Sequence, residues 1–318
     1  MNGVFLDTQS LDTGDLDFKT LKKSLSKWDF YDATHSAEIK ERIKNADVVV
    51  SNKVMLDKDI LKSAKKLKLI CVAATGTNNV DLVTAKKLGM TVCNVTGYAT
   101  PSVVQHVFAL ILGLATKLPD YQRAVRENRW QYSKQFCLLD YPIDEVAGKT
   151  MGIIGYGELG QAVAKAAQAF GINILIAKRP GSKTNKKDRV TLKTLLPQID
   201  ILTLHTPLAD NTKNLIGKKE LALMKPTALL INTARGGIVD EKALASALRN
   251  GKLGGAGVDT LTQEPPTNQN PLLAPDIPNL IVTPHTAWAS RASRQRLLNQ
   301  VADNIEAFKK GEPVNVVG

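Results

Sequence analysis

Residues 151–160 read Met151-Gly152-Ile153-Ile154-Gly155-Tyr156-Gly157-Glu158-Leu159-Gly160. The apolar, β-branched start of this stretch predicts a strand over residues 150–155, and the following residues predict a helix over 159–170. After a strand and before a helix, the pattern G-x-G-x-x-G is typical of a loop that binds the pyrophosphate of a dinucleotide. The alternative is an ordinary glycine turn in an α/β protein. The predicted cofactor contacts of this loop are Gly155, Tyr156, Gly157, Glu158, Leu159 and Gly160.

The rest of the chain repeats this alternation of short β-branched runs with amphipathic stretches, which predicts parallel sheets covered by helices. Strands are expected at residues 3–6, 47–51, 68–73, 91–94, 150–155, 173–177, 201–205, 228–232, 255–259 and 280–283. Helices are expected at residues 39–45, 57–64, 81–88, 101–116, 159–170, 218–224, 241–250 and 291–310. The predicted fold class is therefore α/β, with two doubly wound parallel-sheet domains.

Length and composition agree with a two-domain globular chain and exclude several other classes. The chain has 318 residues and a net charge of +12, but its lysines are scattered and no zinc spacing or aromatic-basic motif accompanies them. We therefore expect no nucleic-acid partner and no metal. No apolar run is long enough to span a membrane, so no membrane association is expected. Cys71, Cys93 and Cys137 are widely spaced, which fits a reducing, cytoplasmic location.

The residues that follow the predicted strand 173–177 bear on which nicotinamide cofactor is used. An acid at the end of this strand favours NAD, because it binds the ribose hydroxyls and repels a 2′-phosphate. The sequence instead has Lys178 and Arg179 there. Charge-assisted bonds from these cations to a 2′-phosphate favour NADP(H) over NAD(H). The alternative is that both side chains point to solvent and the protein uses NAD.

Three chemically suited side chains follow successive predicted strands of the second half. Arg235 follows strand 228–232, Glu264 comes soon after strand 255–259, and His285 follows strand 280–283. Ligands in open α/β sheets bind at the carboxyl ends of strands, so these side chains are expected to meet there. Taken singly, each has a simpler interpretation as a surface ion pair, a loop acid or a capped loop residue.

Together, the three residues match what hydride transfer at a carbonyl carbon requires. Arg235 suits the carboxylate and carbonyl oxygen of a 2-oxo acid, because its planar fork binds two oxygens at once. His285 is the obvious proton donor to the alkoxide near neutral pH. Glu264 beside the imidazole would fix its tautomer and favour its protonated form. The predicted catalytic residues are therefore Arg235, Glu264 and His285.

With these motifs in place, the sequence resembles the D-isomer-specific 2-hydroxyacid dehydrogenase family over nearly its whole length. The resemblance rests on segments 155–160 and 232–237, on Asp259, on Glu264-Pro265 and on Pro284-His285. Within the family it is most similar to glycerate dehydrogenases, also called hydroxypyruvate reductases, through residues 73–81, 130–137 and 285–290. One departure is Lys178, which stands where most NAD-dependent members carry an acid.

The resemblance implies further roles and a domain division. A Rossmann-type cofactor domain would span residues 100–289, and a flavodoxin-like substrate domain residues 1–99 and 290–318. Thr75, Gly76 and Thr77 would hold the substrate carboxylate, and Trp288 would restrict the pocket, although packing near the hinge explains Trp288 equally well. The remaining cofactor contacts would be His205, Thr206, Pro207, Thr212, Thr233, Ala234 and Asp259, with Asp259 on the nicotinamide carboxamide. The extended stretch 118–142 would form a homodimer interface.

The function that these observations predict is transfer of a hydride between NAD(P)H and C2 of a small 2-oxo or 2-hydroxy acid. The expected substrates are hydroxypyruvate and glyoxylate, reduced to D-glycerate and glycolate. Two alternatives remain open at this stage. One is reduction of another 2-oxo acid, such as a 2-ketogluconate. The other is a cofactor-sensing, corepressor-like binding protein, since such proteins can retain the three catalytic residues.

Overall fold

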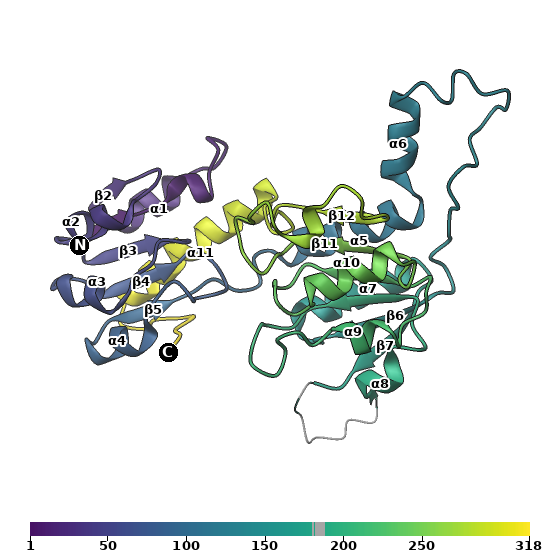
Figure 1. Ribbon diagram of the computed structural model, residues 1–318. Coiled ribbons are helices and arrows are strands. Elements are labelled where there is room, and N and C mark those ends of the chain that lie inside the picture. Colours follow the sequence, from purple (N-terminus) through teal and green to yellow (C-terminus); the bar gives the residue numbers. More distant parts are fainter. Residues whose placement is uncertain (180, 182–187) are drawn as a thin grey trace. The chain divides into compact units, whose positions relative to one another are not determined.

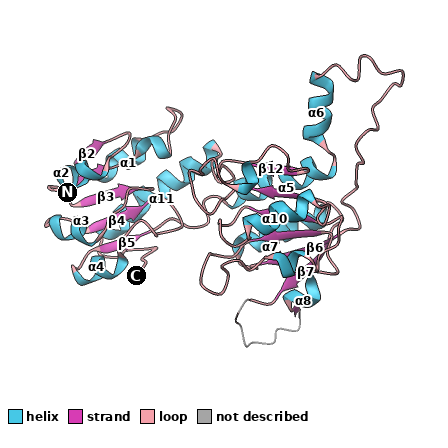
Figure 2. Ribbon diagram, in the orientation of Figure 1, coloured by secondary structure: helices cyan, strands magenta, loops and turns pink. Residues whose placement is uncertain are grey.

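The computed structural model describes residues 1–179, 181 and 188–318. The chain divides into two compact units (Figures 1 and 2). The first comprises Met1–Ala99 and Trp288–Gly318, and the second comprises Thr100–Ala287. The chain thus leaves the first unit before residue 100 and returns to it after residue 287.

The first unit is built on a five-stranded parallel sheet in the order β2-β1-β3-β4-β5. Its strands are β1 (Asn2–Phe5), β2 (Lys27–Phe30), β3 (Val48–Ser51), β4 (Leu69–Val72) and β5 (Thr91–Cys93). Helices α2 (Ile39–Ile43), α3 (Lys58–Ser63) and α4 (Leu82–Lys87) contribute to the core on one face. Helices α1 (Lys19–Ser24) and α11 (Arg291–Lys309) contribute to the core on the other. This is the flavodoxin-like strand order, as predicted.

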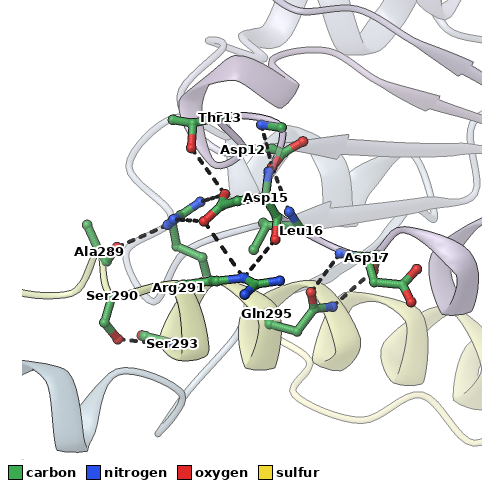
Figure 3. Close-up of polar contacts among 12 residues, drawn as sticks. Asp12, Thr13, Asp15, Leu16, Asp17, Ala289, Ser290, Arg291, Ser293 and Gln295 are labelled. Atoms are coloured by element: carbon green, nitrogen blue, oxygen red, sulfur yellow. Dashed lines mark hydrogen bonds and ion pairs between the residues drawn. The ribbon is translucent and has the colours of Figure 1, made fainter.

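A charged network joins α11 to the loop at residues 12–17 (Figure 3). Arg294 contacts both carboxylate oxygens of Asp15, at 2.8 and 2.7 Å, and also donates to the carbonyl of Leu11. Hydrogen bonding to this guanidinium holds the pKa of Asp15 well below its usual value. Gln295 adds two bonds to the backbone of Asp17. The last helix of the chain is therefore tied to its first thirty residues.

The second unit carries a seven-stranded parallel sheet in the order β12-β11-β10-β9-β6-β7-β8. Its strands are β6 (Thr150–Ile154), β7 (Asn173–Ala177), β8 (Arg189–Val190), β9 (Ile201–Leu204), β10 (Leu229–Asn232), β11 (Gly255–Val258) and β12 (Leu280–Val282). Counted from β6, the order is the Rossmann order with one added edge strand. The order reverses between β6 and β9, which is where ligands bind in such sheets.

Helices cover both faces of this sheet. Helices α5 (Thr100–Ala115) and α7 (Glu158–Ala169) contact each other and lie on one face. Helices α8 (Leu192–Leu195), α9 (Lys218–Leu221) and α10 (Glu241–Arg249) contribute buried leucines to the opposite core. A Cβ on Gly257 of β11 would lie 2.9 Å from the Cβ of Leu110. The absence of that Cβ lets α5 pack closely on the sheet.

The structure confirms two doubly wound α/β units.

Several elements differ from the sequence-based expectation. Strands β2 and β8 and helices α1 and α8 were not predicted. Residues 118–142 were expected to be extended, but α6 (Leu118–Arg126) is helical, with a proline in its first turn. Three short 3₁₀ helices at Thr8–Ser10, Ser36–Glu38 and Pro271–Leu273 complete the assignment. Among the described residues no single helix could cross a membrane, although the bent pair α5 and α6 together has the length and composition.

Candidate active site

The glycine loop between β6 and α7 is held by close backbone contacts. Gly155 has a φ of 92°, and a Cβ there would lie 2.2 Å from the carbonyl oxygen of His205. A Cβ on Gly160 would lie 2.1 Å from the carbonyl oxygen of Gly155. Only glycine fits at either position, so the turn after β6 and the start of α7 are fixed by sterics.

The start of α7 has the features of an anion site. Its N-cap is Gly157, which has no side chain to satisfy the first-turn amides. The amides of Gly157, Glu158 and Leu159 donate to no other described residue. A Cβ on Gly157 would meet no atom within 4 Å, so the backbone is open to a ligand there. Unpaired amides at a helix N-terminus bind phosphate well, and the loop therefore fits a dinucleotide pyrophosphate.

Strand β7 ends at Ala177, so Lys178 and Arg179 directly follow it. Arg179 is exposed, and the backbone amide of Lys178 donates to Val190 of β8 at 2.8 Å. The structure adds one cation that sequence reasoning missed: Arg189, on β8, lies with its guanidinium 5.8 Å from the ring centre of Tyr156 in the glycine loop. No sequence signal pointed to it, because a two-residue strand leaves no readable pattern.

The loop after β9 contains the next group of predicted cofactor residues, which are His205, Thr206, Pro207 and Thr212. Thr212 fixes this loop, since its hydroxyl donates to the carbonyl of Pro207 at 2.8 Å and accepts from the amide of Ala209 at 2.7 Å. His205 Nε2 lies 2.9 Å from the hydroxyl of Thr203, and its Nδ1 is buried without a partner among the described residues. Burial lowers the pKa of His205 to about 4, so its ring is neutral at physiological pH.

Arg235 follows β10 in a tightly packed turn. The side chain of Asn232 accepts a hydrogen bond from the amide of Ala234 at 3.1 Å and donates one to the carbonyl of Arg235 at 3.0 Å. A Cβ on Gly236 would lie 1.9 Å from the carbonyl oxygen of Leu261, so this turn contacts the loop that follows β11. The guanidinium of Arg235 is exposed, and its one hydrogen bond within the described residues is to the carbonyl of Ala234.

The predicted pair of His285 and Glu264 is formed in the structure. His285 Nδ1 lies 2.7 Å from Glu264 Oε2, and each side chain is about one-third exposed. The other carboxylate oxygen, Oε1, accepts the amide of Leu261 at 2.9 Å. Glu264 is therefore oriented by its own loop and orients the imidazole in turn. His285 Nε2 has no partner among the described residues, which leaves it open to a substrate.

Asp259, at the end of β11, supports the loop that carries His285. It is fully buried, and it accepts the amides of Thr286 and Ala287, each at 2.9 Å. Its Oδ1 also accepts the hydroxyl of Thr283, which lies 2.9 Å from Nε2 of His106 on α5. Sequence reasoning did not find this anchoring role or the contribution of His106. The predicted contact of Asp259 with the nicotinamide carboxamide stays a prediction.

Two neighbouring predicted residues, Thr233 and Ala234, are buried after β10, and the Thr233 hydroxyl has no partner among the described residues. The remaining predicted residues lie in the other unit. Thr75 is fixed by bonds with Val95 and Asn94, and the amides of residues 75–77, including Gly76 and Thr77, donate to no described residue. Trp288 contacts the ring of Tyr98 edge-on at 6.4 Å, which agrees with its alternative packing role.

Comparison with known proteins identifies the family. The sequence model of the D-isomer specific 2-hydroxyacid dehydrogenase, NAD binding domain, matches residues 108–287. The chain belongs to this family. This dehydrogenase is thus an NAD(P)-dependent oxidoreductase, and the matched residues contain the glycine loop and all three predicted catalytic residues.

Individual relatives of the dehydrogenase agree with this assignment. It is 47% identical to a glycerate dehydrogenase from Methylorubrum extorquens, over 99% of this chain and 98% of that protein. It is 39% identical to a hydroxypyruvate reductase from Blautia hydrogenotrophica, over 100% and 99% of the two chains. An NADPH-dependent glyoxylate/hydroxypyruvate reductase from Sinorhizobium meliloti, solved with NADP and malonate, superposes with a TM-score of 0.83 at 26% identity, covering 100% and 96% of the chains.

Proposed function

We propose that this dehydrogenase reduces hydroxypyruvate and glyoxylate to D-glycerate and glycolate, with NADPH as the preferred cofactor. The observation that carries the proposal is the 2.7 Å contact of His285 with Glu264 in the loops that follow β12 and β11. It supplies an oriented proton donor near the carboxyl ends of the strands, where the cofactor of such folds binds. The names of the relatives support the choice of substrates.

In the proposed reaction, His285 donates the proton that balances hydride transfer. When bound, the nicotinamide supplies the hydride to C2 of the oxo acid. Negative charge then develops on the carbonyl oxygen, and His285 Nε2 protonates it, leaving the hydroxyl group of the product. Glu264 accepts a hydrogen bond from Nδ1–H of His285 and so orients Nε2 towards the substrate.

We infer that Arg235 binds the oxygens of the substrate. Its guanidinium is exposed and has no carboxylate partner among the described residues, so its donors are open to the oxo-acid oxygens. In the first unit, the amides of residues 75–77 donate to no described residue, which supports their proposed role in holding a substrate carboxylate.

We infer the NADPH preference from the charge after β7. Lys178 and Arg179 stand where an acid would repel a 2′-phosphate, and NADP is the cofactor bound by the Sinorhizobium meliloti reductase.

We also propose that the dehydrogenase forms a homodimer through α6 and the segment that follows it. In Figure 1 this part of the second unit stands away from its sheet. It exposes large apolar side chains that a monomer would leave in water. These are Leu118, Val125, Trp130, Tyr132, Phe136, Leu139 and Ile143. Light scattering after size exclusion tests the proposal: we expect a dimer, and a monomer at all concentrations contradicts it.

The reaction itself is tested by mixing the purified protein with hydroxypyruvate, glyoxylate or a 2-ketogluconate and following NADPH and NADH oxidation in parallel. We expect rapid oxidation with hydroxypyruvate and glyoxylate, faster with NADPH. Faster turnover of the ketogluconate would move the substrate assignment within the class. No oxidation with any oxo acid would overturn the proposed activity and favour a binding role.

A further inference from the structure

Arg189 lies beside the segment that follows β7, although it is separated from it in sequence. Strand β8 pairs with β7 so that Arg189 is opposite Ile176, and the next pair is Val190 with Ala177. The amide of Lys178 then donates to the carbonyl of Val190 at 2.8 Å. The backbone of Arg189 is therefore a direct neighbour of the strand end that carries Lys178 and Arg179.

The side chain of Arg189 points to the face of the sheet where the glycine loop begins α7. Ile153, Ile176 and Arg189 are paired in one row across β6, β7 and β8. Paired residues on neighbouring strands point to the same face of a sheet. A Cβ on Gly160 of α7 would lie 3.5 Å from Ile153, which identifies this face as the one that α7 covers. The position of the guanidinium 5.8 Å from the Tyr156 ring agrees with this.

The donors of Arg189 are not used within the described part of the protein. Its contact with Tyr156 is a cation–π interaction, and it takes part in no ion pair there. Its Nε is buried with no hydrogen-bond partner among the described residues. The acid of the glycine loop, Glu158, accepts instead from the hydroxyl of Thr100 at 2.7 Å. An unpaired buried donor is costly, so a half-buried arginine without an anion points to a ligand that supplies one.

We propose that Arg189 binds the 2′-phosphate of NADPH, together with Lys178 and Arg179, and that stacking on Tyr156 holds its guanidinium in place. The proposal rests on the NADPH preference inferred above. A phosphate offers three acceptor oxygens, and a guanidinium can meet two of them at once. Orientation by an aromatic ring lowers the cost of ordering the long side chain when the phosphate binds. Arg189 is therefore a specificity-determining residue located outside the loop that normally discriminates the two cofactors.

The test compares two adenine nucleotides that differ only in the 2′-phosphate, without any turnover. Calorimetry measures the Kd of 2′,5′-ADP and of 5′-AMP for the wild type, Arg189→Gln and Arg189→Lys. Loss of a charge-assisted hydrogen bond predicts that Arg189→Gln raises the Kd of 2′,5′-ADP about tenfold or more, with the Kd of 5′-AMP changed less than about twofold. Arg189→Lys is expected to recover part of the loss.

Two controls separate this role from a structural one. Lys193→Gln removes an exposed cation on the following helix and is expected to change neither Kd. If Arg189→Gln weakened both nucleotides equally, Arg189 would only support the glycine loop, and the proposal would be overturned. An unchanged 2′,5′-ADP affinity in a variant with a wild-type melting temperature would overturn it too.

The same measurements distinguish failure of this proposal from failure of the NADPH preference. If the wild type binds 2′,5′-ADP no more tightly than 5′-AMP, the preference itself is wrong. If the wild type and Arg189→Gln both bind 2′,5′-ADP more tightly than 5′-AMP, and by the same factor, the NADPH preference is due to Lys178 and Arg179. Only the proposed role of Arg189 is then wrong.

Discussion

His285 holds its Nδ1 2.7 Å from Glu264 Oε2 while its backbone lies in the left-handed region, at a φ of 55°. A residue with a Cβ is uncommon in this region and persists where its surroundings fix it. Here the two amides after His285 donate to the buried carboxylate of Asp259. The orientation of the imidazole is therefore built into the loop and does not depend on the Glu264 contact alone.

Replacing His285 by Ala removes the proposed proton donor. We expect kcat with hydroxypyruvate to fall by roughly 10²–10⁴-fold, with the Kd of NADPH, measured by fluorescence titration, unchanged. Glu264→Gln keeps the size of the side chain and removes its charge, so a smaller fall in kcat is expected. Wild-type turnover in His285→Ala would remove this residue from the mechanism.

Arg235→Lys tests whether substrate binding needs the planar guanidinium group, which can donate to two oxygens at once. A lysine keeps the charge but cannot reach two substrate oxygens with fixed geometry, so kcat/KM for hydroxypyruvate should fall by roughly 10–100-fold. The Kd of NADPH serves as the control and should not move. Unchanged steady-state kinetics would show that Arg235 does not touch the substrate.

Lys178→Glu reverses the charge at the end of β7. A carboxylate there would repel the 2′-phosphate and accept ribose hydroxyls, so the ratio of kcat/KM for NADPH over NADH is expected to drop by about tenfold or more. Lys193→Glu, at an exposed position on α8, provides the same charge change elsewhere. A constant cofactor ratio in Lys178→Glu would contradict the charge-based interpretation.

Gly157→Ala separates ligand binding from folding. A Cβ at Gly157 would meet no protein atom within 4 Å, and the φ of −83° is allowed for alanine, so the melting temperature of the cofactor-free protein should be nearly unchanged. The added methyl would occupy the space through which the pyrophosphate approaches, and the Kd of NADPH should rise at least tenfold. A large loss of stability would mean that Gly157 is a folding residue.

His205 makes stability depend on pH in a defined window. Its pKa is about 4 in the fold against an ordinary value of 6.5. The unfolded chain binds the extra proton between these values, so its contribution is complete above pH 6.5 and is lost as pH falls towards 4. Denaturant titrations should show the wild type losing roughly 1 kcal/mol per pH unit more than His205→Gln over this range. Parallel pH profiles would contradict the prediction.

Most of the fold could be predicted from the sequence because its strands are buried, β-branched and bounded by turns. The missed strands lack that pattern. β2 is partly exposed along its length, and β8 has two residues. The helix α6 was missed because it is short and buries only Ala124, so its sequence has no long apolar face.

The candidate site was predicted where the chemistry belongs to residues at strand ends, as for His285 and Glu264. Roles that depend on which residues of neighbouring strands lie next to each other were not predicted. The anchoring of the His285 loop by Asp259 was not predicted, because its hydrogen bonds to Thr286 and Ala287 depend on how β11 and β12 pair. Arg189 depends in the same way on the register of β8 against β7.

The order in which the two units are completed has a consequence for synthesis on the ribosome. The core of the first unit includes Leu297, Val301 and Ile305 of α11, which are translated only after the whole of the second unit. In the second unit, α5 is translated first but packs against β11 and β12. Each nascent unit therefore exposes an apolar surface, on the sheet of the first unit and on α5 of the second, until the elements that cover it emerge. Such exposed faces are prone to aggregation, so we expect this chain to engage chaperones that shield nascent polypeptides until α11 has emerged.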